Sequence, residues 1–155
     1  MAKPSLTCCI TFDFDAMSVW LGSYKSRNPS AISRGEFGAV AVPRILDMLA
    51  RLDIAASFCI PGHTALAYPD LVKRVRDAGH EIVHHGFLHE NPADFDEAGE
   101  RADLEKGFDA LDKAAGVRPR GYRSPAWDFS EATTTILREY GFLYDSSLMG
   151  DDFSA

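Results

Sequence analysis

Two aspartates near the N-terminus are spaced so that their side chains could act together on one ion. Asp13 and Asp15 follow an apolar run, and Phe14 separates them. Alternation along a strand would point both carboxylates to one side and the phenylalanine to the other. Two carboxylates held together repel each other unless a cation or a proton lies between them. The alternative is that both side chains only cap the loop that follows.

A pair of histidines could supply further ligands to such an ion. His85 and His89 are four residues apart, so their rings could converge from one helical face or across a tight turn. Gly86 and the following Asn91-Pro92 favour the turn. Two neutral imidazoles and one carboxylate make a three-ligand metal site with an open position for water. The alternative is a surface turn, and we assign three other histidines to that ordinary kind: His63, His80 and His84.

A third group of residues, Arg123–Trp127 (RSPAW), could complete a pocket. Arg123 could pair with a buried carboxylate and hold it ionised and oriented, or it could be a surface cation. Trp127 could form a wall of the pocket, or it could be a core or rim aromatic. Trp20 could line the same cleft or anchor its own loop.

The elements that must position these residues alternate between strand and helix. The residue patterns predict strands at 7–13, 55–60, 81–84, 121–124 and 142–146. They predict helices at 40–52, 69–78, 94–115 and 130–140, with Ser130 as a cap. Residues 18–35 are predicted to form a long loop, and a loop of that length is usually functional or mobile. Such alternation predicts an α/β fold with parallel strands and right-handed crossovers.

The polar candidates follow the carboxyl ends of these strands, where barrels and open α/β sheets both place their sites. A closed barrel needs about seven or eight strands, whereas this pattern contains about five. The sequence is therefore either an open sheet or the N-terminal part of a longer domain, and we favour the second interpretation. Within it, residues 1–155 form a single domain.

The composition excludes several classes of protein. The 155 residues carry a net charge of −7, which provides no electrostatic footprint for nucleic acid or anionic lipid. No segment is apolar for long enough to cross a membrane, and Met1–Ser5 does not begin a signal peptide. We therefore expect a cytoplasmic location. Three cysteines in apolar runs are expected to be buried free thiols: Cys8, Cys9 and Cys59.

Taken together, these motifs resemble the polysaccharide deacetylase family, which shares the NodB homology domain. Thr11–Asp15 (TFDFD) is similar to the family's Thr-Phe-Asp-Asp motif, with Phe14 inserted before the second aspartate. His85–His89 matches its His-x-x-x-His motif, and Arg123–Trp127 matches its arginine-containing third motif. The resemblance extends over essentially the whole chain.

This resemblance implies a distorted (β/α)7 barrel, of which the chain contains about the first five β/α units. It implies that Asp15, His85 and His89 bind a divalent metal, usually Zn²⁺, although iron, cobalt or manganese would also suit these ligands. It further implies that Asp13 is the general base, with Arg123 keeping it ionised. The family's last motifs contain an aspartate and a general-acid histidine, and the chain ends before them.

Two segments, Trp20–Tyr24 and Tyr144–Met149, together with the Phe14 insertion look like the intracellular branch of the family. That branch includes peptidoglycan-deacetylase-like, allantoinase-like and cyclic-imide-hydrolysing proteins. It implies hydrolysis of C–N bonds in N-acetylated sugars or in small cyclic amides and imides, with Trp20, Pro125 and Trp127 at the substrate. It also implies a homo-oligomer, since a partial barrel exposes edge strands. A non-catalytic protein that keeps the fold is the remaining alternative.

Overall fold

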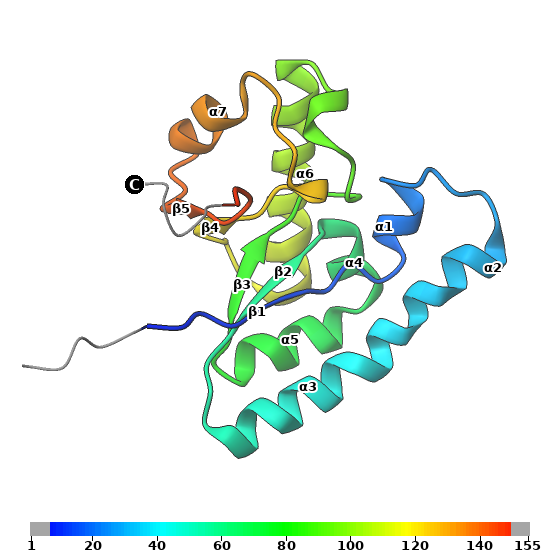
Figure 1. Ribbon diagram of the computed structural model, residues 1–155, viewed down its shortest axis with the longest axis vertical. Coiled ribbons are helices and arrows are strands. Elements are labelled where there is room, and N and C mark those ends of the chain that lie inside the picture. Colours follow the sequence, from blue (N-terminus) through cyan, green and yellow to red (C-terminus); the bar gives the residue numbers. More distant parts are fainter. Residues whose placement is uncertain (1–6, 150–155) are drawn as a thin grey trace, which may run out of the picture.

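A computed structural model describes residues 7–149, in which five strands form one parallel sheet (Figure 1). The strands lie side by side in the order in which they occur along the chain. They are β1 (Thr11–Asp13), β2 (Ser57–Ile60), β3 (Glu81–His84), β4 (Gly121–Tyr122) and β5 (Tyr144–Asp145). Helical segments join each strand to the next, so the α/β class predicted from the sequence is confirmed.

The main helices flank this sheet, and most lie within a few residues of the predicted ranges. They are α3 (Gly38–Leu52), α4 (Gly62–Ala67), α5 (Pro69–Asp77), α6 (Glu97–Ala115) and α7 (Thr133–Glu139). The sequence patterns missed α4, which is too short to show a helical period. The predicted loop at 18–35 contains the short helices α1 (Ser18–Leu21) and α2 (Pro29–Ile32) and the start of the 3₁₀ helix η1 (Ser33–Phe37). Two further 3₁₀ turns are η2 (Pro92–Asp94) and η3 (Pro125–Trp127).

Local capping decides where the helices begin and end. The Asp96 side chain accepts a hydrogen bond from the backbone N–H of Gly99, so α6 starts after it rather than at the predicted position 94. The same helix ends at Gly116, whose φ of 63° is the left-handed conformation that glycine adopts without strain. The predicted cap of α7, Ser130, is not its N-cap, because the helix begins only after Ala132; Ser130 Oγ instead accepts from the N–H groups of Ala132 and Thr133 in the turn before it.

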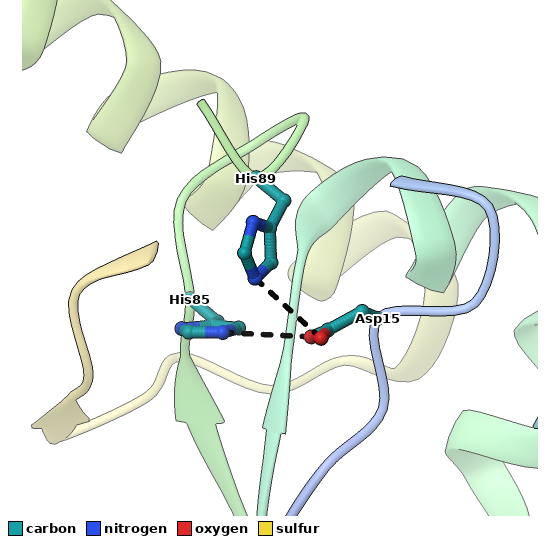
Figure 2. Close-up of side chains that lie close together, drawn as sticks. All are labelled: Asp15, His85 and His89. Carbon is teal, nitrogen blue, oxygen red and sulfur yellow. Dashed lines mark ion pairs between the residues drawn. The ribbon is translucent and has the colours of Figure 1, made fainter. Parts of the chain in front are cut away.

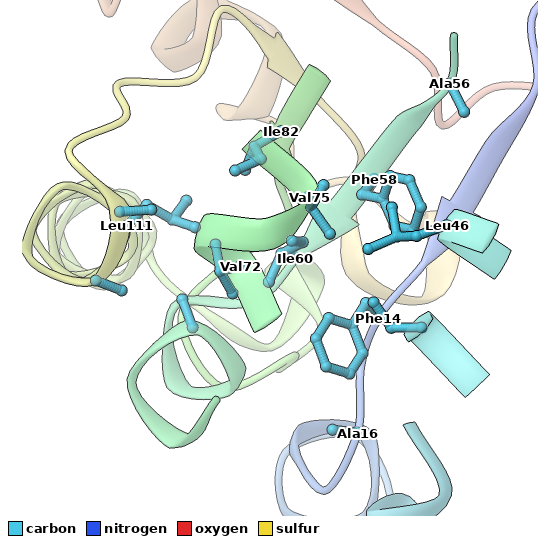
Figure 3. Close-up of a cluster of buried hydrophobic side chains, with 14 of the residues drawn as sticks. Phe14, Ala16, Leu46, Ala56, Phe58, Ile60, Val72, Val75, Ile82 and Leu111 are labelled. Carbon is cyan, nitrogen blue, oxygen red and sulfur yellow. The ribbon is translucent and has the colours of Figure 1, made fainter. Parts of the chain in front are cut away.

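The hydrophobic core lies between the sheet and helices α3, α5 and α6 (Figure 3). Phe14 is buried in it, with its ring centroid 5.9 Å from that of Tyr68, whereas Asp13 and Asp15 are only partly covered. The predicted alternation of this segment is therefore confirmed. Burying the phenylalanine anchors the end of β1 and leaves both carboxylates on the opposite side.

Two burial predictions were wrong. His84, expected at the surface, is fully buried at the end of β3, where its ring contacts Phe108 and Tyr122. Burial lowers the pKa of His84 to about 4, so the neutral ring is the form that the core accommodates. Cys8 and Cys9 are exposed, because the paired part of β1 begins only at Thr11, after them. Cys59 is buried as expected.

Substituting Gly107 by alanine should destabilise the fold, although alanine is the better helix former. Gly107 lies on α6 against the His84 ring, and a Cβ atom at this position would overlap Nε2 of that ring. We expect Gly107→Ala to lower the free energy of unfolding by about 1–3 kcal/mol, measured by urea denaturation. The exposed Asp109→Ala on the same helix should change it by less than about 0.5 kcal/mol. A Gly107→Ala protein as stable as the parent would show that this contact is not tight.

Within residues 7–149, no helix combines the length and the apolar character that crossing a membrane requires. The Met1–Ser5 segment, for which the sequence predicts no signal peptide, lies outside the described residues.

Candidate metal centre

The segments that follow β1 and β3 bring Asp15, His85 and His89 together, as Figure 2 shows. One carboxylate oxygen of Asp15, Oδ1, lies 3.5 Å from His85 Nε2, and the other, Oδ2, lies 3.5 Å from His89 Nε2. The three ligand atoms all lie within 4.8 Å of one another. The two imidazole planes are perpendicular, with centroids 4.7 Å apart. The predicted three-residue cluster is therefore present in the fold.

Two atoms of this cluster are buried without a hydrogen-bond partner among the described residues: Asp15 Oδ1 and His85 Nε2. Leaving such atoms unpaired is costly, and their separation of 3.5 Å is too long for a hydrogen bond. Ligands bound at about 2.0–2.1 Å to a tetrahedral zinc ion are about 3.3 Å apart. The spacing and the unpaired atoms therefore fit a divalent cation between the three side chains.

A tight turn presents the two histidines to Asp15. Gly86 has a φ of +68°, so the chain leaves β3 in a turn rather than a helix, as the sequence predicted. The carboxylate of Asp103 on α6 accepts the backbone N–H of Phe87 at 3.0 Å and so holds the turn. His89 itself adopts a left-handed φ of 61°, which is uncommon for a residue other than glycine.

The hydrogen bonding of His85 leaves a lone pair directed at the cluster. His85 Nδ1 lies 2.7 Å from the carbonyl oxygen of Arg123. Because a carbonyl can only accept, Nδ1 carries the proton and Nε2 is free to bind a metal. Burial and the neighbouring His89 lower the pKa of His85, and burial also lowers the pKa of His89. Both rings are therefore held in the neutral form that a metal requires.

Asp15 differs from the histidines, because its ordinary charged form is disfavoured. Burial, with the nearby charge of Asp13, raises the pKa of Asp15 to about 7, and the charge of Arg123 opposes the shift. In the metal-free protein this carboxyl group is therefore largely protonated below pH 7. A bound cation would displace the proton.

The raised pKa of Asp15 predicts that Zn²⁺ binding depends on pH. Below pH 7 each bound ion must release the Asp15 proton, so we expect the affinity to rise about tenfold per pH unit up to about pH 7 and then level off. Calorimetry at pH 6 in buffers of different ionisation enthalpy should report the release of about one proton per ion. An affinity that does not change between pH 5.5 and 7 would contradict this assignment.

Arg123 forms an ion pair with Asp13, the carboxylate that the family resemblance assigns to it. Its Nη1 donates to Asp13 Oδ1 at 2.6 Å, and its Nη2 donates to the hydroxyl of Thr11 at 3.0 Å. Its Nε donates to Ser146 Oγ at 3.0 Å, so all three guanidinium nitrogens are engaged. Asp13 is thereby held beside Asp15 in a fixed orientation.

A chain of hydroxyl groups, which the sequence patterns did not single out, supports the backbone of Asp15. Thr64 Oγ1 donates to the Asp15 carbonyl at 2.6 Å, and Ser18 Oγ lies 2.7 Å from Thr64 Oγ1. His63 Nδ1 lies 3.0 Å from Ser18 Oγ at the outer end. The next residue, Ala16, has a left-handed φ of 47°, so these bonds hold a strained connection beside a candidate metal ligand.

The three residues predicted to contact substrate lie in different environments. Trp20 lines a cavity of about 290 Å³ together with Asp13 and Asp15. Pro125 is buried and packs next to Gly86. Trp127 is 55% exposed. Only Trp20 thus shares a described cavity with the carboxylates, and contact with substrate stays a prediction for all three residues.

The chain is similar in sequence to known proteins. Residues 9–144 match the family described as polysaccharide deacetylase. The chain is 40% identical over 144 residues to a peptidoglycan deacetylase of Helicobacter pylori, and the alignment covers 92% of this chain and 49% of the relative. The chain spans about half the length of this relative and of a peptidoglycan deacetylase-like protein of Gibberella zeae.

Solved structures of similar proteins have the same fold as this chain. A Mycobacterium smegmatis protein assigned as a polysaccharide deacetylase superposes with a TM-score of 0.86 at 42% identity, over 91% of this chain and 50% of that one. The PuuE allantoinase superposes with a TM-score of 0.80 at 25% identity, over 93% and 54% of the two chains. The predicted fold, the first β/α units of the family's barrel, is thus confirmed. With its family match, its relatives and its fold in agreement, the chain belongs to the polysaccharide deacetylase family.

Proposed function

We propose that the protein containing this chain is a metal-dependent hydrolase that removes acetyl groups from N-acetylated sugars by cleaving the amide C–N bond. The observation that carries the proposal is the convergence of Asp15, His85 and His89, with two unpaired buried atoms, beside the Arg123-held Asp13. Because the alignments cover about half of each relative, we also propose that residues 1–155 are the N-terminal part of a longer domain.

Asp15, His85 and His89 would hold a divalent cation, and this donor set favours Zn²⁺ among the metals that it suits. A cation bound there would activate a water molecule and polarise the scissile carbonyl. Asp13 would take the proton of the attacking water as general base. Arg123 would act as a positioning residue, because its three-way hydrogen bonding fixes where the Asp13 carboxylate points.

A small cyclic amide or imide is the second candidate substrate class. The superposition on an allantoinase supports it, because that protein's name describes action on a small cyclic amide. The segment 18–35 supports it as well, since Trp20 and Arg34 from this segment line the cavity next to Asp15. This cavity does not include His85 or His89, and segment 18–35 would favour a small substrate over a polymer, which needs an open groove, only by closing over them as well.

An assay of the full-length Zn²⁺-loaded protein tests the proposal. Acetate release from N-acetylglucosamine oligomers and from peptidoglycan fragments would be compared with ring opening of allantoin and of a cyclic imide. We expect acetate release, lost in an Asp13→Asn variant that still binds metal. Ring opening without acetate release would show that the substrate is a small cyclic amide or imide and not an N-acetylated sugar. Metal binding with no turnover of any of these would contradict both and would favour the non-catalytic alternative.

A further inference from the structure

Ser23, in the turn that follows α1, makes two contacts with the single residue His89. Its Oγ lies 2.7 Å from the His89 carbonyl oxygen and 2.7 Å from His89 Nδ1. One hydroxyl group from a segment 66 residues away in sequence therefore holds both the main chain and the ring of a candidate metal ligand.

The protons of these two hydrogen bonds can be assigned. A carbonyl oxygen can only accept, so the one hydroxyl proton of Ser23 goes to the His89 carbonyl. The second contact then requires His89 Nδ1 to donate to the lone pair of Ser23 Oγ. His89 is consequently the Nδ1–H tautomer, and its Nε2, 3.5 Å from Asp15 Oδ2, keeps a free lone pair.

The approach of Ser23 to His89 depends on the glycine before it. A Cβ atom on Gly22 would overlap the backbone of Leu88 and crowd that of His89, so any larger residue would push the segment away. His89 also has the left-handed φ of 61°, a conformation that surrounding contacts must stabilise. Gly22 allows the contact, and Ser23 then bonds the strained residue at both its ring and its carbonyl.

We propose that Ser23 is a positioning residue of the metal centre, which selects the Nδ1–H tautomer of His89 and so presents Nε2 to the cation. This inference rests on the proposed metal site. Partners that bind the outer nitrogen of a metal-bound histidine orient the ring, and losing one typically weakens metal binding by about 10- to 100-fold. The partner of His85 Nδ1 is a backbone carbonyl, which mutation cannot remove, whereas the Ser23 hydroxyl can be removed by substitution.

The test compares Ser23→Ala and Ser23→Thr with the parent and with Ser33→Ala, which removes an exposed hydroxyl on η1 that donates to the Ser30 carbonyl. Calorimetric titration with Zn²⁺ should show an affinity about 10- to 100-fold weaker for Ser23→Ala, parent-like affinity for Ser33→Ala, and recovery for Ser23→Thr, which restores the hydroxyl. Ser23→Ala binding as tightly as the parent would overturn the inference. A parent that binds no Zn²⁺ would instead overturn the proposed metal site.

A second measurement takes its decisive result from the metal-free parent rather than from a variant's affinity. Nitrogen-15 NMR of the histidine rings in the metal-free parent distinguishes the two neutral tautomers directly. The His89 ring, assigned with His89→Gln, should be the Nδ1–H form in the parent and a mixture in Ser23→Ala. An Nε2–H ring in the parent would overturn the inference whatever the affinities are.

Discussion

Replacing Asp15 with alanine should abolish metal binding while leaving the protein folded. Asp15 supplies the only negative charge among the three clustered side chains, and each of its oxygens faces one histidine. Without it, two neutral imidazoles remain, and we expect the dissociation constant for Zn²⁺ to rise roughly a thousandfold or more, equivalent to about 4 kcal/mol. Hydrolytic activity should be lost together with the metal.

The Asp15→Ala substitution should not lower the stability of the metal-free protein. Because burial raises the pKa of Asp15 to about 7, the folded state binds more protons than the unfolded state between about pH 4 and 7. Stability due to this group therefore decreases as pH rises through that range. At pH 8 the Asp15→Ala protein lacks this unfavourable buried charge, so we expect its thermal unfolding to occur no lower than that of the metal-free parent.

Elemental analysis of the purified proteins provides the measurement. We expect about one metal ion per chain in the parent and none in Asp15→Ala or in His89→Ala. Asp47→Ala, which removes an exposed carboxylate from α3, should keep the parent's metal content. Equal metal content in Asp15→Ala and the parent would show that the ion binds elsewhere.

The Asp13→Asn substitution should separate catalysis from metal binding. Asparagine keeps the size of the side chain and an oxygen that Arg123 can contact, but it cannot accept a proton from water. If Asp13 is the general base, kcat should fall about 10²- to 10⁴-fold, because that is the typical contribution of a positioned base. Zn²⁺ affinity should change only a few-fold, since Asp13 is not among the three clustered ligands.

Steady-state kinetics on the metal-loaded full-length proteins would check this expectation, with metal content measured on the same samples. Arg123→Lys is the companion variant, because it keeps the charge but has one donor nitrogen in place of the three that bond Ser146, Asp13 and Thr11. Its kcat should lie between those of the parent and Asp13→Asn. A parent-like kcat in Asp13→Asn would show that Asp13 is not the general base. Loss of the metal in this variant would show instead that Asp13 is one of the metal ligands.

Local patterns in the sequence predicted much of the fold, and the family resemblance implied which residues form the candidate metal site. Strand alternation places Asp13 and Asp15 opposite Phe14, and this alternation is a property of any extended segment. Gly86 indicates a turn between the two histidines, because glycine adopts positive φ without strain. The parallel order of the strands follows from the alternation of strand and helix patterns.

Local sequence patterns could not predict contacts between distant segments. The burial of His84 and the exposure of Cys8 depend on which elements cover them, and residue type alone does not specify this. Ser23 and Thr64 are common polar residues without a motif of their own, yet they bond the His89 ring and the Asp15 carbonyl. Their roles depend on distances set when α1 and α4 pack against the ends of the strands.

The sequence by itself thus determined the strand and helix order, the family and the side chains that could bind a metal. Tertiary structure alone decided the protonation of those side chains. Burial and the neighbouring Asp13 charge set the pKa of Asp15, and hydrogen bonds from distant segments set the tautomers of His85 and His89. Periodicity is a short-range property of the chain, whereas desolvation and hydrogen bonding depend on every segment that folds against a residue.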